Sequence, residues 1–180
     1  MKKIMKILAL VFILCLGLTG CSSDSKNPVQ KKAQAAEIGV TVGKTAPAFG
    51  LQDLDGNPVS VNAAADNKLY VLNFWATWCP PCRAEMPDLE RFYQSQKGNV
   101  QFYAINLDEP TDQVKSFISS NGLTFPVLSD KGGTLSGEFK VNAIPTTLVI
   151  DKQGVIRMRK AGTTTEAELN SVLHKIAGEN

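Results

Sequence analysis

An apolar run that leads directly into a pair of cysteines constrains this chain more than any other stretch. Residues 69–75 are almost entirely apolar, which predicts a strand buried on both faces and central in a parallel sheet. Cys79 and Cys82 follow at the start of a predicted helix, separated by Pro80 and Pro81. The partial positive charge of a helix N-terminus favours a thiolate at Cys79, the form that attacks disulfides. The stretch therefore predicts a redox-active cysteine pair.

A zinc site and a structural disulfide are the alternative interpretations of this pair. Zinc needs about four ligands, usually in two paired clusters. The chain has four cysteines and one histidine. Cys15 and Cys21 lie near the N-terminus, and His174, which we expect on a helix surface, lies near the other end, so a second ligand pair is missing. We therefore expect no metal, and no cofactor other than the Cys79–Cys82 disulfide.

The composition leaves most function classes open. A length of 180 residues allows one domain with a sizeable core once an N-terminal segment is set aside. The formal net charge of +2 is too small to indicate nucleic acid or an acidic substrate, and no basic run is interleaved with aromatic residues. We therefore expect no nucleic-acid partner.

The N-terminus has the features of a bacterial lipoprotein. Lysines precede an apolar run, residues 7–18, which is too short to span a bilayer but suits the core of a signal peptide. Residues 18–21 (Leu-Thr-Gly-Cys) resemble a lipobox, whose cysteine takes a diacylglyceryl group. We expect residues 1–20 to be a lipoprotein signal peptide and Cys21 to be lipidated. An ordinary signal peptide and an uncleaved anchor are the alternatives.

A lipid anchor would place the protein on the extracytoplasmic face of the cell membrane. The two acyl chains of a diacylglyceryl group on Cys21 are enough for stable anchoring, and disulfides persist in that compartment. Residues 21–42 are polar and rich in Ser, Lys, Gln and Ala, which predicts a flexible tether. Residues 43–180 then form the folded domain.

The pattern of the domain predicts an α/β fold. Two short extended runs around an Asp-Gly-Asn turn indicate an N-terminal β-hairpin within residues 43–61, and a polar link follows. Thr165 and Glu168 have the spacing of a capping box at the start of the last helix. Further strands are predicted over residues 69–75, 100–107, 125–128, 147–150 and 155–160, and further helices over residues 80–96, 111–121 and 134–139. Parallel strands joined by helices, with a late antiparallel hairpin, give a mixed central sheet with helices on both faces.

Several motifs together resemble those of a known family. They are residues 73–82, the Glu-Met-Pro of residues 85–87, the Ala-Ile-Pro-Thr-Thr of residues 143–147 and the Ala-Pro-Ala-Phe of residues 46–49. With these motifs the chain resembles thioredoxin-fold proteins, and among them the membrane-anchored ResA/TlpA group of thiol–disulfide oxidoreductases. The resemblance runs from about Gly43 to the C-terminus. It implies a thioredoxin fold with an inserted strand–helix segment at residues 107–128.

The resemblance implies roles for residues around the cysteines. Pro145 would be a cis-proline that faces the pair and turns the backbone of Ile144 toward an extended substrate. A trans proline that merely starts a strand is the alternative. We expect contacts with the substrate from four residues at this surface: Trp78, Pro80, Pro81 and Ile144.

Two polar residues near the pair are candidates for proton transfer. In ordinary thioredoxins the position of Asn73 holds a buried aspartate that exchanges protons with the inner cysteine, which an asparagine cannot do. Glu85 lies one turn past Cys82 and matches an active-site glutamate of the ResA group. We hypothesise that Glu85 tunes the thiols or relays protons to Cys82. The alternative is a solvated helix carboxylate.

The implied catalytic cycle starts from the reduced pair. The Cys79 thiolate attacks a substrate disulfide, and Cys82 resolves the mixed disulfide. By resemblance, a membrane thiol carrier of the CcdA/DsbD type would supply the reducing equivalents. The leading substrate candidate is apocytochrome c, and spore-envelope proteins are another possibility in this group. We expect the protein to act as a monomer.

Four other functions stay open for this sequence. The first is the reverse chemistry, a disulfide-forming oxidase. A peroxidase on the same fold expects proline and threonine where this chain has Leu72 and Ala76, and peroxide consumption would detect it. A copper chaperone of the related Sco type uses a C-x-x-x-C spacing and a distant histidine, and absence of Cu(I) binding would remove it. A non-catalytic lipoprotein would show no phenotype in Cys79→Ser.

Overall fold

The computed structural model of this chain describes residues 37–178. The expected signal peptide, the candidate lipidation site Cys21 and the tether as far as residue 36 lie outside the described residues, so these stay predictions. No helix within residues 37–178 is both long enough and apolar enough to cross a bilayer.

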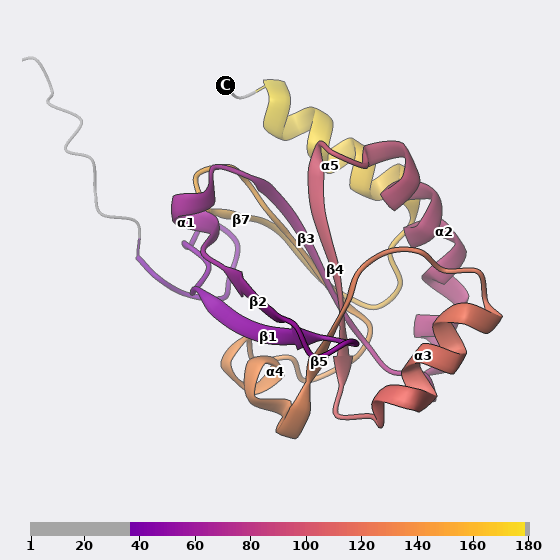
Figure 1. Cartoon of the computed structure of the whole chain (residues 1–180). Coiled ribbons are helices and arrows are strands. Elements are labelled where there is room, and N and C mark those ends of the chain that lie inside the picture. The colour runs from indigo at the N-terminus through magenta and orange to yellow at the C-terminus, as the bar shows by residue number, and fades with distance from the viewer. Residues whose placement is uncertain (1–36, 179–180) are drawn as a thin grey trace, which may run out of the picture. The chain divides into compact units, whose positions relative to one another are not determined.

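Within the described residues, seven strands form one sheet in the order β2-β1-β5-β4-β3-β6-β7. All of them except β6 are labelled in Figure 1. The strands are β1 (Phe49–Asp53), β2 (Pro58–Val61), β3 (Leu69–Trp75), β4 (Val100–Leu107), β5 (Val127–Asp130), β6 (Thr146–Ile150) and β7 (Ile156–Ala161). The helices are α1 (Ala63–Asp66), α2 (Pro80–Gln96), α3 (Thr111–Ser120), α4 (Thr134–Glu138) and α5 (Glu166–Gly178), with a short turn of helix, η1 (Lys131–Gly133), before α4. Strands β3, β4 and β5 are parallel, and the other pairings are antiparallel.

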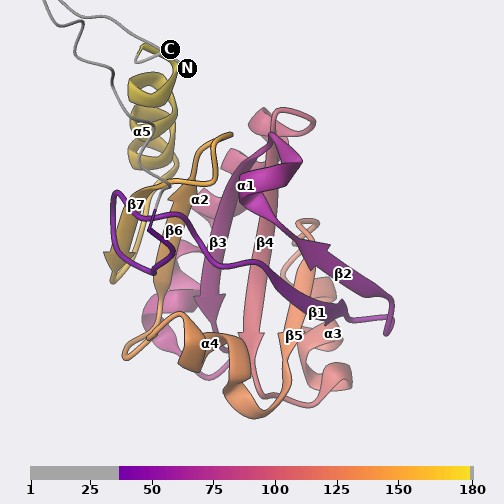
Figure 2. The same ribbon diagram turned by 90° about the vertical axis from the view of Figure 1, so that its left-hand side faces the viewer.

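Strand β3 lies at the centre of the sheet, as its apolar sequence predicts. It pairs in parallel with β4 and antiparallel with β6, and every residue after Leu69 in this strand is buried. Helices cover both faces of the sheet (Figure 2). Helices α2, α3 and α5 pack on one apolar core, and α1 and α4 pack on a second core. This arrangement confirms the expected mixed sheet between helical layers.

The N-terminal stretch of the described chain crosses the sheet from one edge to the other (Figure 2). The N–H of Thr45 donates to the carbonyl of Glu37 at 3.0 Å, and the N–H of Gly43 donates to the carbonyl of Ile156 on β7 at 2.9 Å. The chain then continues into β1 and β2 at the opposite edge. Residues 37–42, expected in the tether, are thus bonded to the domain, because their backbone groups find partners there. The tether prediction is wrong for these residues.

Two other expectations differ from the structure. The link before β3 contains the short helix α1, because the carboxylate of Asp66 accepts the N–H of Asn62 at 2.9 Å and holds the turn. Strand β5 begins at Val127, two residues later than expected. We attribute this shift to Pro126, which has no N–H to donate to a sheet.

The remaining elements agree closely with the predicted ones. At the start of α5, the N–H of Thr165 donates to Oε2 of Glu168 at 3.0 Å, and the N–H of Glu168 donates to Oγ1 of Thr165 at 3.3 Å. These reciprocal bonds confirm the capping box. Strand β7 is an edge strand.

Gly154, in the turn between β6 and β7, is expected to tolerate no side chain. Its φ is +80°, a region that L-residues avoid, and a Cβ there would lie 2.6 Å from the Cα of Ala64 in α1. Gly56 has a similar φ of +88° but nothing within 4 Å. We expect Gly154→Ala to lower the free energy of unfolding by about 2 kcal/mol more than Gly56→Ala does. Chemical denaturation measures the difference, and equal losses would show that α1 moves aside freely.

Candidate active site

The cysteine pair lies where the central strand is followed by its helix. Strand β3 ends at Trp75 and α2 begins at Pro80, which suits the first helical position because no N–H is needed there. Cys79 is the N-cap, with extended backbone angles, and its Sγ accepts the N–H of Cys82 at 3.2 Å. The two cysteines form a disulfide with an S–S distance of 2.10 Å. Both are almost fully buried, and Cys79 is the more accessible of the two.

The loop before β6 places Ile144 and Pro145 against the disulfide. The Ile144–Pro145 peptide bond is cis, which confirms the geometry implied for Pro145. The carbonyl oxygen of Ile144 lies 3.8 Å from Sγ of Cys79. Antiparallel pairing of β6 with β3 holds this loop beside the cysteines. Pairing of the Ile144 backbone with a substrate strand stays a prediction.

The surface around the disulfide is open and largely apolar. Trp78 is 66% exposed, Pro80 and Pro81 are exposed, and Ile144 is partly buried. An exposed indole beside a nearly buried sulfur suits recognition of an apolar segment of a partner protein. The residues expected to contact the substrate therefore lie next to the reactive sulfur, and the contacts themselves stay a prediction.

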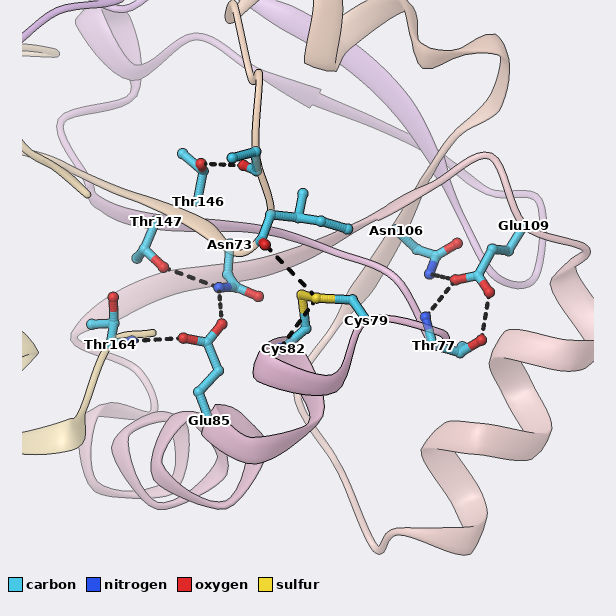
Figure 3. Close-up of a disulfide and its surroundings, with 12 residues drawn as sticks. Asn73, Thr77, Cys79, Cys82, Glu85, Asn106, Glu109, Thr146, Thr147 and Thr164 are labelled. Carbon is cyan, nitrogen blue, oxygen red and sulfur yellow. Dashed lines mark hydrogen bonds between the residues drawn. A yellow bond between two sulfur atoms is a disulfide. The ribbon is translucent and has the colours of Figure 1, made fainter. Parts of the chain in front are cut away.

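Glu85 is buried beside the disulfide (Figure 3). Its Oε1 accepts an amide N–H of Asn73 at 2.8 Å, and its Oε2 accepts the backbone N–H of Thr164 at 2.7 Å. The same amide nitrogen of Asn73 also donates to Oγ1 of Thr147 at 3.0 Å. The alternative of a solvated helix carboxylate is therefore wrong, because the helix face that carries Glu85 packs against the sheet.

Burial raises the pKa of Glu85 to about 7, since it removes water from the charged form. The two hydrogen bonds to its oxygens and the attraction of Lys160 lower this pKa but are weaker, and Asp88 adds a small increase. A carboxyl group with such a pKa exchanges its proton near neutral pH. Because Glu85 is also one helical turn from Cys82, the geometry is compatible with the hypothesis of a proton relay.

Glu109 is a buried carboxylate that no motif in the sequence singled out. It lies in the loop between β4 and α3 and accepts the backbone N–H of Thr77 at 2.7 Å. Asn106 and Gln113 also donate to it, at 2.6 Å and 2.9 Å. The signal available in the sequence is the spacing of Glu109 and Gln113, which lie four positions apart on either side of the residue where the helix begins.

No three side chains of His, Cys, Asp or Glu come together as a candidate metal site between residues 37 and 178. His174 is exposed on α5, as expected. The groups at the site that can carry a reaction are the two cysteines and the carboxyl group of Glu85.

Known proteins with similar sequences share this domain. The AhpC/TSA family matches residues 42–159. The thioredoxin-like protein YneN of Bacillus subtilis is 34% identical over 167 residues, which cover 91% of this chain and 94% of YneN. The thiol–disulfide oxidoreductase ResA of Bacillus thuringiensis is 38% identical over 136 residues, which cover 75% of this chain and 78% of ResA.

Solved structures of similar proteins have the same fold. StoA from Bacillus subtilis is 30% identical, with a TM-score of 0.62 over 71% of this chain and 96% of StoA. A secreted disulfide oxidoreductase of Mycobacterium tuberculosis, described as homologous to DsbE of E. coli, is 27% identical, with a TM-score of 0.61 over 71% of this chain and 95% of its own. Because the family match spans most of the chain and ResA aligns over most of its length, we conclude that the chain belongs to the AhpC/TSA family, as a thiol–disulfide oxidoreductase of the ResA type.

Proposed function

We propose that this thiol–disulfide oxidoreductase works as a reductase of protein disulfides. The Cys79 thiolate attacks one sulfur of the substrate disulfide, and the other substrate sulfur leaves as a thiolate and takes up a proton. The Cys82 thiolate then attacks Sγ of Cys79 and releases the second substrate thiol. Two electrons pass from the pair to the substrate, and the pair ends as the disulfide present in the structure. A thiol donor then reduces it again.

The oxygen groups around the disulfide support reduction of the substrate as the direction of exchange. A strongly oxidising pair needs a stabilised reduced form, mainly through its thiolate. Among the described residues, Sγ of Cys79 accepts one hydrogen bond, while the carbonyl oxygen of Ile144 faces it at 3.8 Å. The buried carboxyl group of Glu85 lies beside the pair as well (Figure 3). Both oxygen groups disfavour a thiolate, so they favour the oxidised pair and make the reduced pair a better reductant.

We place the protein on the extracytoplasmic face of the cell membrane, anchored by a lipid on Cys21. The lipobox-like sequence supports this location, and so does the description of the Mycobacterium tuberculosis relative as secreted. Incorporation of labelled palmitate that is lost in Cys21→Ala tests the anchor. The substrates would be disulfides of secreted or membrane-attached proteins, with apocytochrome c as the candidate. The donor would be a membrane thiol carrier of the CcdA/DsbD type.

The reduction potential of the Cys79–Cys82 couple is expected near or below about −220 mV, the range of thioredoxin and the glutaredoxins. Equilibration of the purified full-length protein in glutathione buffers, followed by thiol alkylation, measures it. Glu85→Gln should raise this potential, because it removes a group that disfavours the thiolate. A value above about −150 mV, toward the strong oxidant DsbA, would instead make this protein a disulfide-forming enzyme.

A further inference from the structure

The loop before Cys79 is held by a buried carboxylate that takes no part in the exchange reaction. Oε2 of Glu109 accepts the backbone N–H of Thr77 at 2.7 Å, and Oε1 accepts the hydroxyl of the same threonine. Gln113 donates to that hydroxyl oxygen at 2.8 Å and to Oε1 of Glu109 at 2.9 Å. Asn106 donates to Oε2 at 2.6 Å. These contacts join the end of β4 and the start of α3 to the active-site loop. Figure 3 shows those that Glu109 makes with Asn106 and Thr77.

The same arrangement occurs a second time in the domain. Glu90 on α2 accepts the backbone N–H of Thr124 at 2.8 Å and its hydroxyl at 2.5 Å. Gln94 donates to Oε1 of Glu90 at 2.9 Å and to the hydroxyl of Thr124. In both cases a glutamate and a glutamine four positions apart hold one threonine. Glu90 lies eight residues beyond Cys82 along α2, roughly 12 Å away, so this second contact holds a loop remote from the disulfide.

The position of Thr77 determines the position of the nucleophile, Cys79. The N–H of Cys79 donates to the carbonyl of Ala76 at 3.2 Å, so a tight turn joins the threonine to the cysteine. Cys79 must occupy the N-cap for its sulfur to accept the N–H of Cys82. We propose that Glu109 is a positioning residue, which holds Thr77 so that Cys79 stays at the N-cap and its thiolate stays reactive. The proposal applies to either direction of exchange and does not depend on the reductase assignment.

Two opposite effects of Glu109 on Cys79 can be separated by substitution. A negative charge near Cys79 disfavours its thiolate, so removal of the charge alone would make the thiol more reactive at neutral pH. Loss of the contact with Thr77 would move the sulfur away from the helix N-terminus and make it less reactive. Glu109→Gln removes the charge and disrupts the contact. Glu109→Asp keeps the charge but is one methylene too short for the same contact.

The test is the pH profile of Cys79 alkylation by iodoacetamide in the reduced full-length protein, with the modified peptide quantified by mass spectrometry. We expect Glu109→Gln and Glu109→Asp both to shift this profile to higher pH. A shift of one pH unit would slow alkylation at pH 7 by about threefold, because a loss of about tenfold in thiolate is partly offset by greater nucleophilicity. Glu90→Gln is the matched control and should leave the profile unchanged. Thr77→Val, which keeps the carboxylate, should give a smaller shift in the same direction.

Three outcomes would overturn the proposal. In the first, the alkylation profile moves to lower pH in Glu109→Gln and does not move in Glu109→Asp. This result would show that Glu109 affects Cys79 only through its negative charge. Profiles of both variants that coincide with that of Glu90→Gln would show that the contact only stabilises the fold. If neither Glu109 variant folds, folded Thr77→Val is compared with the wild type. An alkylation profile that is the same in both would overturn the proposal.

Discussion

Replacement of Cys79 by serine is expected to abolish thiol–disulfide exchange. Cys79 is the more accessible of the two cysteines and caps the helix whose N-terminus stabilises a thiolate. A serine hydroxyl stays protonated at neutral pH and does not attack a disulfide. With insulin as the probe and dithiothreitol as the reductant, we expect the rate of disulfide reduction by Cys79→Ser to fall to that of dithiothreitol alone.

Cys82→Ser is the matched control, because both variants lose the same disulfide. It keeps the nucleophile and lacks the resolving thiol, so we expect a mixed disulfide with the substrate to accumulate at Cys79. Mass spectrometry detects this adduct, and dithiothreitol should remove it. An adduct that accumulates in Cys79→Ser and not in Cys82→Ser would exchange the roles of the two cysteines. Full turnover by Cys79→Ser would show that the reaction does not depend on Cys79.

The stability of the oxidised protein is expected to fall as the pH rises from about 5 to 8, and this fall should disappear in Glu85→Gln. The pKa of Glu85 is raised to about 7 in the folded state, against an ordinary value of 4.5. Between these pH values the folded protein keeps a proton that the unfolded chain releases. The contribution to stability is therefore fully present below pH 4.5 and is lost as the pH rises through 7. Its size is on the order of 3 kcal/mol.

Urea denaturation at constant ionic strength across this pH range measures the effect. Asp88 and Lys160, the charged groups that act on Glu85, remain in both proteins. Glu138→Gln, which changes an exposed carboxylate on α4, is the control and should keep the pH dependence of the wild type. Parallel curves for the wild type and Glu85→Gln would contradict the raised pKa of Glu85.

The elements that carry the chemistry could be predicted because their signals are local. The apolar run of β3, the proline that opens α2 and the capping box of α5 each act within a few residues, and the structure confirms all three. The cis bond before Pro145 is different, since its prediction came from the family resemblance. A proline alone leaves both isomers accessible.

The surroundings of the two buried glutamates could not be predicted, because distant parts of the chain form them. Glu85 accepts a hydrogen bond from Thr164, which is 79 residues away, and Glu109 accepts one from Thr77, which is 32 residues away. A carboxylate one turn past a cysteine has the same local sequence whether the final packing exposes it or buries it. Sequence patterns therefore left the alternatives for Glu85 open, and the packing of α2 against the sheet decided between them.

Because the N-terminal stretch crosses the sheet, some contacts of the domain can form only after most of the domain has been synthesised. Gly43 is made early, but its partner Ile156 on β7 is made 113 residues later. The loop that brings Pro145 to the cysteines also follows α2 by about fifty residues, and contacts of such long range form late in folding. A nascent chain therefore presents Cys79 and Cys82 before the loop with Pro145 is available to cover them. Thiols and oxidants that meet the emerging chain therefore have their first access to the pair on an incomplete domain.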